Sequence, residues 1–181
     1  MPEQPPHEVQ ALVARYLPSI RAFVRMRMGA ELRAKEETCD ITQSVAREVL
    51  QHADRFQHGG EEGFREWLFT TAHRKVKKRL RHWRAARRDG QQEASLPEEL
   101  AGLVATPSHH ATAREHLAAV EQAFDGLTPE QRDVITWSRL AGLSHAQIAQ
   151  RLDKSEVAVR KILSRALARL TAILAAANPD D

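Results

Sequence analysis

Residues 127–167 carry the sequence LTPEQRDVITWSRLAGLSHAQIAQRLDKSEVAVRKILSRAL, in which three helix starts follow one another at short intervals. Thr128 and Ser144 can each cap a helix through the side-chain oxygen, and a glutamine three residues later can bond back to each cap. A third N-cap candidate is Ser155. The stretch therefore predicts a helix that ends near Gly142, then a short helix, a turn and a longer helix.

The last two helices of this stretch match the pattern of a helix-turn-helix. Small Ala149 lets the two helices approach each other. The apolar side chains that fill the angle between them are Ile148, Leu152, Val159 and Ile162. Asp153 stands at the turn, where glycine is usual, and aspartate tolerates the left-handed conformation better than most residues.

The far side of the longer helix carries short and basic side chains that suit the major groove of DNA. They are Val157, Lys161, Ser164 and Arg165, with Arg160 at the margin of this side. The other interpretation is a helical hairpin whose charged face contacts no DNA.

A strongly basic segment lies upstream, at residues 67–88. It holds nine cationic side chains and no acidic one. They are Arg74, Lys75, Lys77, Lys78, Arg79, Arg81, Arg84, Arg87 and Arg88. Such a run predicts a polyanionic partner, of which a phosphate backbone is the commonest. The alternatives are a solvated helical face and a tail that binds a membrane surface.

A glycine-containing loop at residues 57–63 precedes the basic segment, and aromatic residues flank it. Phe56, Phe64 and Trp67 lie beside a basic strip, where aromatic rings can stack on exposed bases. Each of these rings also fits the hydrophobic core, so both interpretations stay open.

Residues 40–53 predict another amphipathic helix. Its buried stripe recurs every four residues and consists of Ile41, Val45, Val49 and Ala53. Asp40, Gln43 and Arg47 fall on the opposite side of the helix. A capping box formed by Asp40 and Gln43 is an alternative explanation of the polar positions.

The whole chain of 181 residues is rich in helix formers, with 42% hydrophobic and only 5% aromatic residues. Helical periodicity fills residues 7–88 and 114–177, whereas glycine and proline interrupt residues 89–113. We expect an all-α fold of two small helical domains joined by a flexible linker at residues 89–113. Such a linker permits both a closed and an extended arrangement.

Composition also narrows the location and the class of function. Cys39 is the sole cysteine, so no intramolecular disulfide can form, which suits a reducing compartment. The N-terminus lacks the apolar segment of a signal peptide, and no run reaches the length of a membrane span, so we expect a cytoplasmic protein. Phosphate loops, metal-ligand clusters and nucleophile motifs are missing from the sequence. We therefore expect no enzymatic activity, no cofactor and no metal.

The two patterned regions together resemble the sigma-70 family of bacterial RNA polymerase sigma factors. The similarity to region 4 of that family lies in residues 127–135 (LTPEQRDVI), 141–144 (AGLS), 147–149 (QIA), Val159 and 164–167 (SRAL). The similarity to region 2 lies in residues 40–45 (DITQSV), 55–56 (RF) and 64–68 (FREWL). Both regions in this order, with a short linker between them, resemble the extracytoplasmic-function (ECF) group.

This resemblance implies a transcription initiation factor that binds core RNA polymerase, directs it to specific promoters and assists melting of the −10 element. Residues 7–88 would form region 2, and residues 114–177 would form region 4. The partners would be the clamp helices of the largest polymerase subunit, the flap of the second-largest subunit and promoter DNA. An anti-sigma factor is a further candidate partner, and no membrane insertion is expected.

The resemblance also assigns roles to residues. Binding to core polymerase would use Asp40, Gln43, Ser44 and Arg47. Binding and melting of the −10 element would use Arg55, Phe56, Phe64, Trp67, Arg74, Lys75, Lys78 and Arg79. Binding of the −35 element would use Ser155, Glu156, Val157, Arg160, Lys161, Ser164 and Arg165. Ser44 and His73 depart from the usual family pattern, which leaves the polymerase contact and the −10 preference open.

The alternative function is an autonomous helix-turn-helix regulator that does not engage polymerase. Such a regulator would share residues 127–167 but would need neither the polar face of residues 40–47 nor a single-strand-binding region. Tight and specific binding of duplex DNA by the free protein would favour it.

Overall fold

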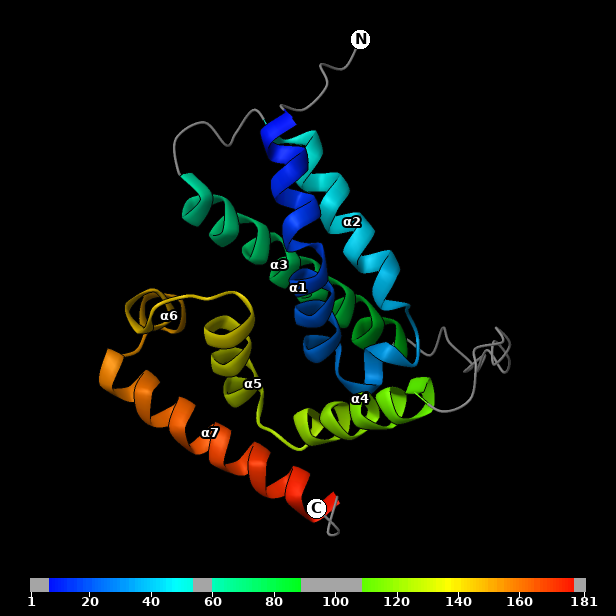
Figure 1. The fold of residues 1–181 in the computed structure, drawn as a ribbon, viewed down its shortest axis with the longest axis vertical. Helices are drawn as coiled ribbons and strands as arrows, with labels where there is room; N and C mark the ends of the chain where they lie inside the picture. Colours follow the sequence, from blue (N-terminus) through cyan, green and yellow to red (C-terminus); the bar gives the residue numbers. More distant parts are fainter. Residues whose placement is uncertain (1–6, 54–59, 89–108, 178–181) are drawn as a thin grey trace.

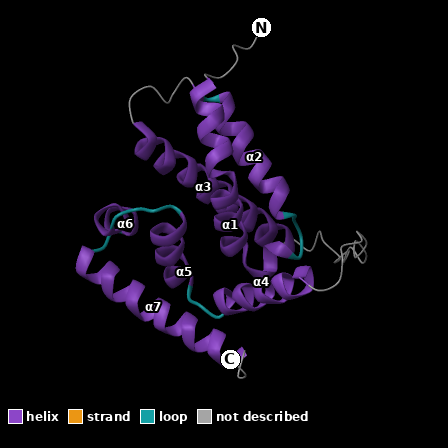
Figure 2. Ribbon diagram, viewed as in Figure 1, coloured by secondary structure: helices purple, strands orange, loops and turns teal. Residues whose placement is uncertain are grey.

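The computed structural model describes residues 7–53, 60–88 and 109–177 of the chain. Helices are the regular structure throughout these ranges, as Figure 2 shows, and this confirms the expected all-α class. The elements are α1 (His7–Arg33), α2 (Thr38–Gln51), α3 (Gly60–Arg88), α4 (His109–Asp125), α5 (Pro129–Ile135), the π-helical turn η2 (Thr136–Leu140), α6 (His145–Leu152) and α7 (Glu156–Ala177).

Helices α1, α2 and α3 pack against one another and form the N-terminal group (Figure 1). Phe23 of α1 is fully buried and meets Phe69 of α3 edge to face, with ring centroids 5.1 Å apart. The stripe expected for residues 40–53 is buried as well: Ile41, Val45 and Val49 lie on α2, and Ala53 follows the end of that helix. Apolar periodicity in the sequence thus correctly identified the core-facing side of α2.

Helix α1 is broken close to its C-terminal end. Gly29 has φ 66° and ψ 168°, a conformation that glycine adopts without strain. A Cβ atom at this position would also lie only 3.1 Å from Nη1 of Arg132, a residue of α5. Glycine therefore permits both the break in the helix and the close approach of an arginine from the other half of the chain.

Helices α4, α5, α6 and α7 form the C-terminal group, in which α7 packs against the other three. Trp137, on η2, is 2% exposed and is the largest of the fully buried side chains. Helix α4 begins at His109, inside the segment that the sequence predicted as linker. Residues 89–108, which make up the rest of that segment, lie outside the described residues.

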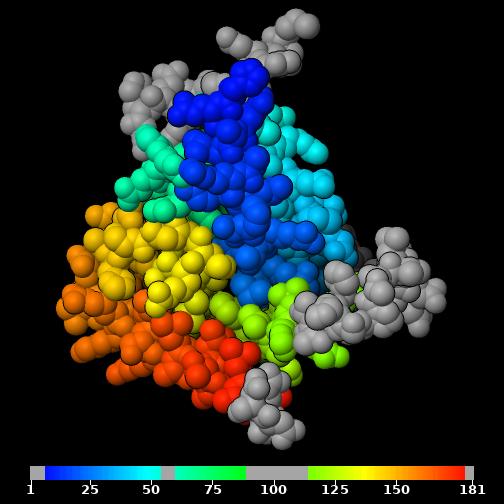
Figure 3. Space-filling view, in the orientation of Figure 1, coloured from blue at the N-terminus to red at the C-terminus, as the bar shows by residue number. Residues whose placement is uncertain are grey.

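The two groups are packed together in a closed arrangement. Helix α1 lies against α4, α5 and η2, and one continuous cluster of buried side chains runs through both groups. Figure 3 shows the atoms around α5, in yellow, directly against those of α1, in blue. Of the two arrangements that the sequence left open, the structure therefore has the closed one.

Candidate nucleic-acid interface

The helix-turn-helix begins with two capping boxes, as its sequence predicted. Oγ1 of Thr128 accepts a hydrogen bond from the Gln131 backbone at 3.2 Å, and the Gln131 side chain accepts one from the Thr128 backbone at 3.0 Å. Ser144 and Gln147 form the same pair of bonds, at 3.2 and 2.8 Å. These reciprocal bonds fix where α5 and α6 begin.

The turn between α6 and α7 is set by two polar residues. Asp153 has φ 52° and ψ 52°, the left-handed conformation expected for it. Oγ of Ser155 then accepts a hydrogen bond from the Ala158 backbone at 3.2 Å, which caps the start of α7. Ile148, Ala149 and Val159 are buried in the angle between the helices. The predicted helix-turn-helix geometry is therefore present.

The outer side of α7 is open. All the side chains expected to bind the −35 element are exposed, and Val157 is an exposed apolar residue at 53%. Among the described residues, Arg160, Lys161 and Arg165 have no hydrogen-bond or ion-pair partner on the chain. A row of free cations and small polar groups on the second helix of such a motif can enter the major groove.

The polar face of α2 is also open. Asp40, Gln43 and Arg47 are exposed. Helix α2 begins at Thr38 after Glu37, so Asp40 lies inside the helix and the capping box considered for it is absent. Ser44 is half-buried and accepts a hydrogen bond from Nζ of Lys75 at 2.9 Å.

The basic segment of α3 contains both unpaired and paired cations. Arg74 and Lys78 are exposed, and neither has a hydrogen-bond or ion-pair partner among the described residues. Lys75 instead pairs with Glu48 of α2 at 2.7 Å, and Arg79 lies 3.5 Å from a Glu36 oxygen. Two of the four cations on α3 that were expected to bind the −10 element are thus held by carboxylates.

The aromatic residues before the basic segment differ in exposure. Phe64 is 0% exposed and packs against Tyr16 and Trp67, with centroid distances of 6.4 and 6.1 Å. Its ring is a core residue in this arrangement and offers no face on which a base could stack. Trp67 is half-buried. Arg55 and Phe56, the other expected residues, lie outside the described residues.

Sequence reasoning missed the contact centred on Arg27, which joins the two groups. The Arg27 side chain is 6% exposed and donates to Asp133 at 2.5 Å and to Oγ1 of Thr136 at 2.8 Å. Its guanidinium also lies over the rings of Phe23 and Trp137, 5.0 and 5.4 Å from their centroids. Burial lowers the pKa of Arg27, and Asp133 opposes that shift. An arginine within the apolar stripe of α1 was the available signal.

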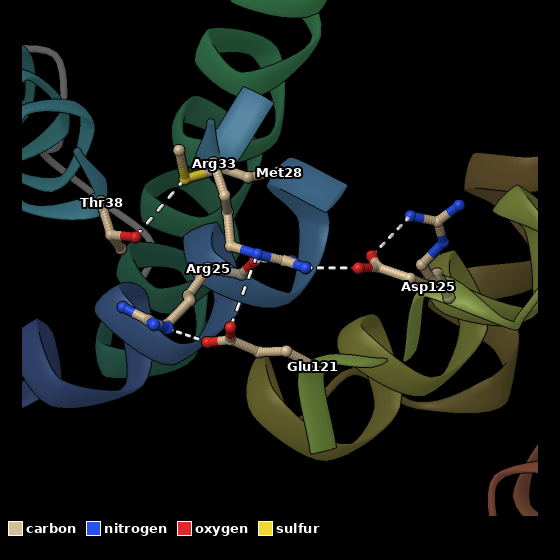
Figure 4. Close-up of polar contacts among 7 residues, drawn as sticks. Arg25, Met28, Arg33, Thr38, Glu121 and Asp125 are labelled. Atoms are coloured by element: carbon tan, nitrogen blue, oxygen red, sulfur yellow. Dashed lines mark hydrogen bonds and ion pairs between the residues drawn. The ribbon is translucent and has the colours of Figure 1, made fainter. Parts of the chain in front are cut away.

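Further ion pairs join α1 to α4. Figure 4 shows Arg25 bonded to Glu121 and Arg33 bonded to Asp125. Nε of Arg33 lies a further 3.6 Å from Glu121. The N-terminal group supplies the arginines here, and the C-terminal group supplies the carboxylates.

Contacts on the side of α6 join the N-terminal half of α3 to the helix-turn-helix. Arg151 of α6 pairs with Glu66 of α3 at 2.6 Å, and Arg65 donates to the Gly142 carbonyl at 3.1 Å. A small cleft beside them is lined by Trp67 and Arg74 of α3, among others, and by residues of α6. Helix α6 therefore lies against the part of α3 that was expected to bind the −10 element.

His73 of α3 lies inside the same interface. Its ring is 5.2 Å from the ring of Trp137, and its Nδ1 atom is buried without a hydrogen-bond partner among the described residues. Burial, followed by the positive charges of Arg27, Lys77, Arg151 and Arg74, lowers the pKa of His73 from 6.5 to about 3. His73 is therefore neutral at physiological pH in this arrangement.

Neither a metal site nor a membrane span is found among the described residues. No three His, Cys, Asp or Glu side chains there are grouped as a metal site would require. None of the described helices has the length and apolarity to span a bilayer.

Comparison with family models places both halves of the chain. Residues 12–88 match the model described as "Sigma-70 region 2", and residues 117–170 match "Sigma-70, region 4". The two matches cover most of the N-terminal group and most of the C-terminal group.

Curated relatives agree with these matches. The RNA polymerase sigma factor NccH of Alcaligenes xylosoxydans xylosoxydans is 31% identical over 116 residues, which are 61% of this chain and 60% of that protein. The ECF RNA polymerase sigma factor BldN of Streptomyces coelicolor is 27% identical over 172 residues, 94% of this chain and 60% of that protein. The chain thus spans about 60% of the length of these relatives.

Solved structures share the fold. The sigma factor RpoE from Bartonella quintana, in complex with the anti-sigma factor NepR, has a TM-score of 0.63 at 19% identity, with 92% of this chain and 96% of that chain covered. CnrH in complex with the cytosolic domain of CnrY has a TM-score of 0.59 at 22% identity, with 93% and 88% covered.

Proposed function

The chain belongs to the sigma-70 family, in its ECF group with regions 2 and 4, and on this premise we propose that it is a promoter-specificity factor of bacterial RNA polymerase. It binds core polymerase, directs it to specific promoters and assists melting of the −10 element. Sigma factors are not enzymes, and the nucleotidyl chemistry belongs to the polymerase.

Region 4 reads the −35 element through α7. The observation that carries this role is that all seven side chains assigned to the −35 element are exposed, and that their cations have no partner among the described residues. Arg160, Lys161 and Arg165 can reach guanine edges or phosphates, and Ser164 can bond to either. Glu156 near the start of the helix can accept a bond from cytosine or interact favourably with the helix dipole.

Region 2 docks on the polymerase through α2. Asp40, Gln43 and Arg47 form an exposed polar face, whereas the opposite side of α2 is buried in the core. We assign this face to the clamp helices of the largest subunit. Ser44 belongs to the same face but is already bonded to Lys75, so its contribution is to hold Lys75 in position.

Region 2 also binds the −10 element through α3. Arg74 and Lys78 are the exposed and unpaired cations that suit a phosphate backbone. Lys75 and Arg79 join them once their carboxylate partners, Glu48 and Glu36, are displaced. Because α6 lies against Trp67 and Arg74, use of this surface requires the two groups to separate first.

Further partners follow from the neighbours in fold. The solved structures of RpoE and CnrH contain NepR and CnrY, and RpoE is described with an anti-sigma factor. An anti-sigma factor is therefore a reasonable partner for this chain as well, in the cytoplasm where the polymerase is located.

Run-off transcription with purified core polymerase tests the proposal. The template is a pool of genomic promoters, transcribed with and without the protein. Transcripts that depend on the protein and share −35 and −10 elements would support it. No such transcripts, together with no binding to core polymerase, would refute it and favour an autonomous regulator.

A further inference from the structure

A cleft of about 780 Å³ lies between the two groups, and we call it the interregional cleft. Its walls come from α1 and α3 on one side and from α4, the Asp125–Pro129 connection and α5 on the other. Cavities of about 300–1,000 Å³ are typical of sites for small ligands. The size of this cleft therefore suits a molecule of the dimensions of a nucleotide.

Positive charge predominates in the interregional cleft. Six arginine and lysine side chains line it, against three carboxylates. Each carboxylate is already occupied: Asp133 is bonded to Arg27, Asp125 to Arg33, and Glu31 to Arg84 at 3.2 Å. The excess positive charge therefore has no counter-charge among the described residues.

Three of these cations are free. Arg74, Lys77 and Arg81 are exposed and have no hydrogen-bond or ion-pair partner in the described part of the chain. Their spacing of three and four residues puts them on one side of α3, which faces the cleft. Fixed cations in a row of this kind can bind successive phosphate groups.

Cationic side chains also lie close to one another within the interface. Burial, and after it the cations Arg27, Lys77, Arg151 and Arg74, lowers the pKa of His73. Arg132, which also lines the cleft, opposes the charge on Arg27, and its own Nε atom is buried without a partner among the described residues. An anion bound in the cleft would offset part of this positive charge.

We propose that the interregional cleft binds a small oligophosphate, the di- or triphosphate group of a nucleotide-sized ligand, through Arg74, Lys77 and Arg81. Met28, Val76, Leu80 and Pro129 supply an apolar surface for the rest of that ligand. Duplex DNA is excluded from the closed cleft because it is far wider than a small-ligand site.

Such a ligand would act on the closed arrangement. Because the cleft takes walls from both groups, a molecule bound there favours the closed form over any separated form. If the proposed promoter role holds, this ligand would lower the availability of α3 for the −10 element. Binding itself is measured on the protein alone, so failure of the binding test and failure of the transcription test are distinguishable.

Calorimetric titration of the full chain with tripolyphosphate, at fixed physiological salt, tests the site. We expect saturable binding that sulfate at the same ionic strength does not reproduce. NMR titration of the His73 ring signals should show a higher pKa when tripolyphosphate is bound, because the bound anion offsets the nearby cations.

Two matched double variants locate the binding. Lys77→Ala with Arg81→Ala removes two cleft cations that have no internal partner, so the fold should persist, as circular dichroism would check. Affinity for tripolyphosphate should fall by on the order of tenfold or more, because charge-assisted bonds are lost. Arg21→Ala with Arg169→Ala removes two exposed cations elsewhere and should bind as the unaltered chain does.

Three results would overturn the proposal. Equal heats with sulfate would show non-specific ion binding. Unchanged affinity in the Lys77→Ala, Arg81→Ala variant would place the anion elsewhere. In a competition experiment, a short single-stranded oligodeoxynucleotide and a nucleoside triphosphate are each used to displace tripolyphosphate. Displacement by the oligodeoxynucleotide at the lower concentration would assign these cations to the DNA backbone.

Discussion

Helices α3 and α7 both carry cationic residues that we assign to promoter DNA, but the two surfaces differ in availability. At α7 the side chains assigned to the −35 element are all exposed. On α3 two of the assigned cations are held by carboxylates, and α6 lies against Arg74. The closed chain can therefore present α7 to a −35 element without rearrangement, whereas the −10 surface first has to be released.

The largest effect is expected where the two groups meet, at Trp137. Trp137→Ala leaves a cavity beside Phe23 and His73, and the free energy of unfolding should fall by about 3–5 kcal/mol. Urea denaturation followed by circular dichroism measures the loss. Freed from region 4, α3 should also bind single-stranded DNA more tightly than in the unaltered chain.

Trp83→Ala is the matched control for this variant. Trp83 is half-buried near the end of α3 and donates to Glu36 at 2.7 Å, away from the contact between the groups. Trp83→Ala should lower the free energy of unfolding by less than Trp137→Ala does. It should leave the affinity for single-stranded DNA as in the unaltered chain. An equal loss in both variants would contradict the central role of Trp137.

The next effect concerns α7 alone. Lys161→Ala with Arg165→Ala should lower −35-dependent transcription by about ten- to hundredfold, because a good base contact is worth about 1–3 kcal/mol. Binding to core polymerase should not change. Arg169→Ala, on the same helix beyond the assigned row, is the control. Equal activity of the double variant on intact and −35-scrambled promoters would argue against the assignment.

A smaller effect is the pH dependence of stability that arises from His73, on the side of α3 that contacts the C-terminal group. The pKa of His73 is about 3 in the closed chain, against an ordinary value of 6.5. Below pH 6.5 His73 is protonated in the unfolded chain but stays neutral in the folded chain. The free energy of unfolding is therefore unaffected by this group above pH 6.5 and falls as pH decreases towards 3. The slope from this group is at most about 1.4 kcal/mol per pH unit.

Urea denaturation between pH 7 and about 5, above the usual range of carboxylate titration, isolates this contribution. The variant His73→Gln should show a shallower dependence on pH than the unaltered chain. Identical slopes would mean that His73 is not desolvated at the interface in solution.

The smallest effect separates paired from free cations on α3. Lys75→Ala removes the contacts with Glu48 and Ser44 and should lower stability by less than about 1 kcal/mol, since the pair is partly exposed. Lys78→Ala removes a free ammonium and should change stability by less than about 0.5 kcal/mol. Urea denaturation measures the free energy of unfolding of both variants. A larger loss of stability for Lys78→Ala than for Lys75→Ala would contradict the assignment of Lys75 as paired and Lys78 as unpaired.

Local patterns in the sequence were sufficient for much of the fold. The caps at Thr128 and Ser144, the left-handed turn at Asp153 and the buried stripe of α2 each depend on residues within one or two turns of each other. Their physical cause is therefore contained in a short window of sequence. The exposed row on α7 follows from the same periodicity, because burial of one side leaves the other side open.

Long-range contacts could not be predicted in this way. Arg27 meets Asp133 and Thr136, which are more than a hundred positions away in the sequence. No periodicity relates such residues. Phe64 shows the same limit, because an aromatic residue beside a basic segment fits a stacking platform and a core equally well until its neighbours are known. Only the packed structure distinguishes them.

The buried ion pair between Arg27 and Asp133 affects the specificity with which the N-terminal and C-terminal groups pack. Desolvation offsets much of the attraction in such a pair, so it adds little net binding energy, but a misplaced arginine would be left uncompensated. The pair therefore penalises every misregistered assembly while leaving the correct one easy to separate. Replacing both residues by apolar ones, Arg27→Met with Asp133→Leu, should strengthen the association but yield several sets of NMR signals in place of one.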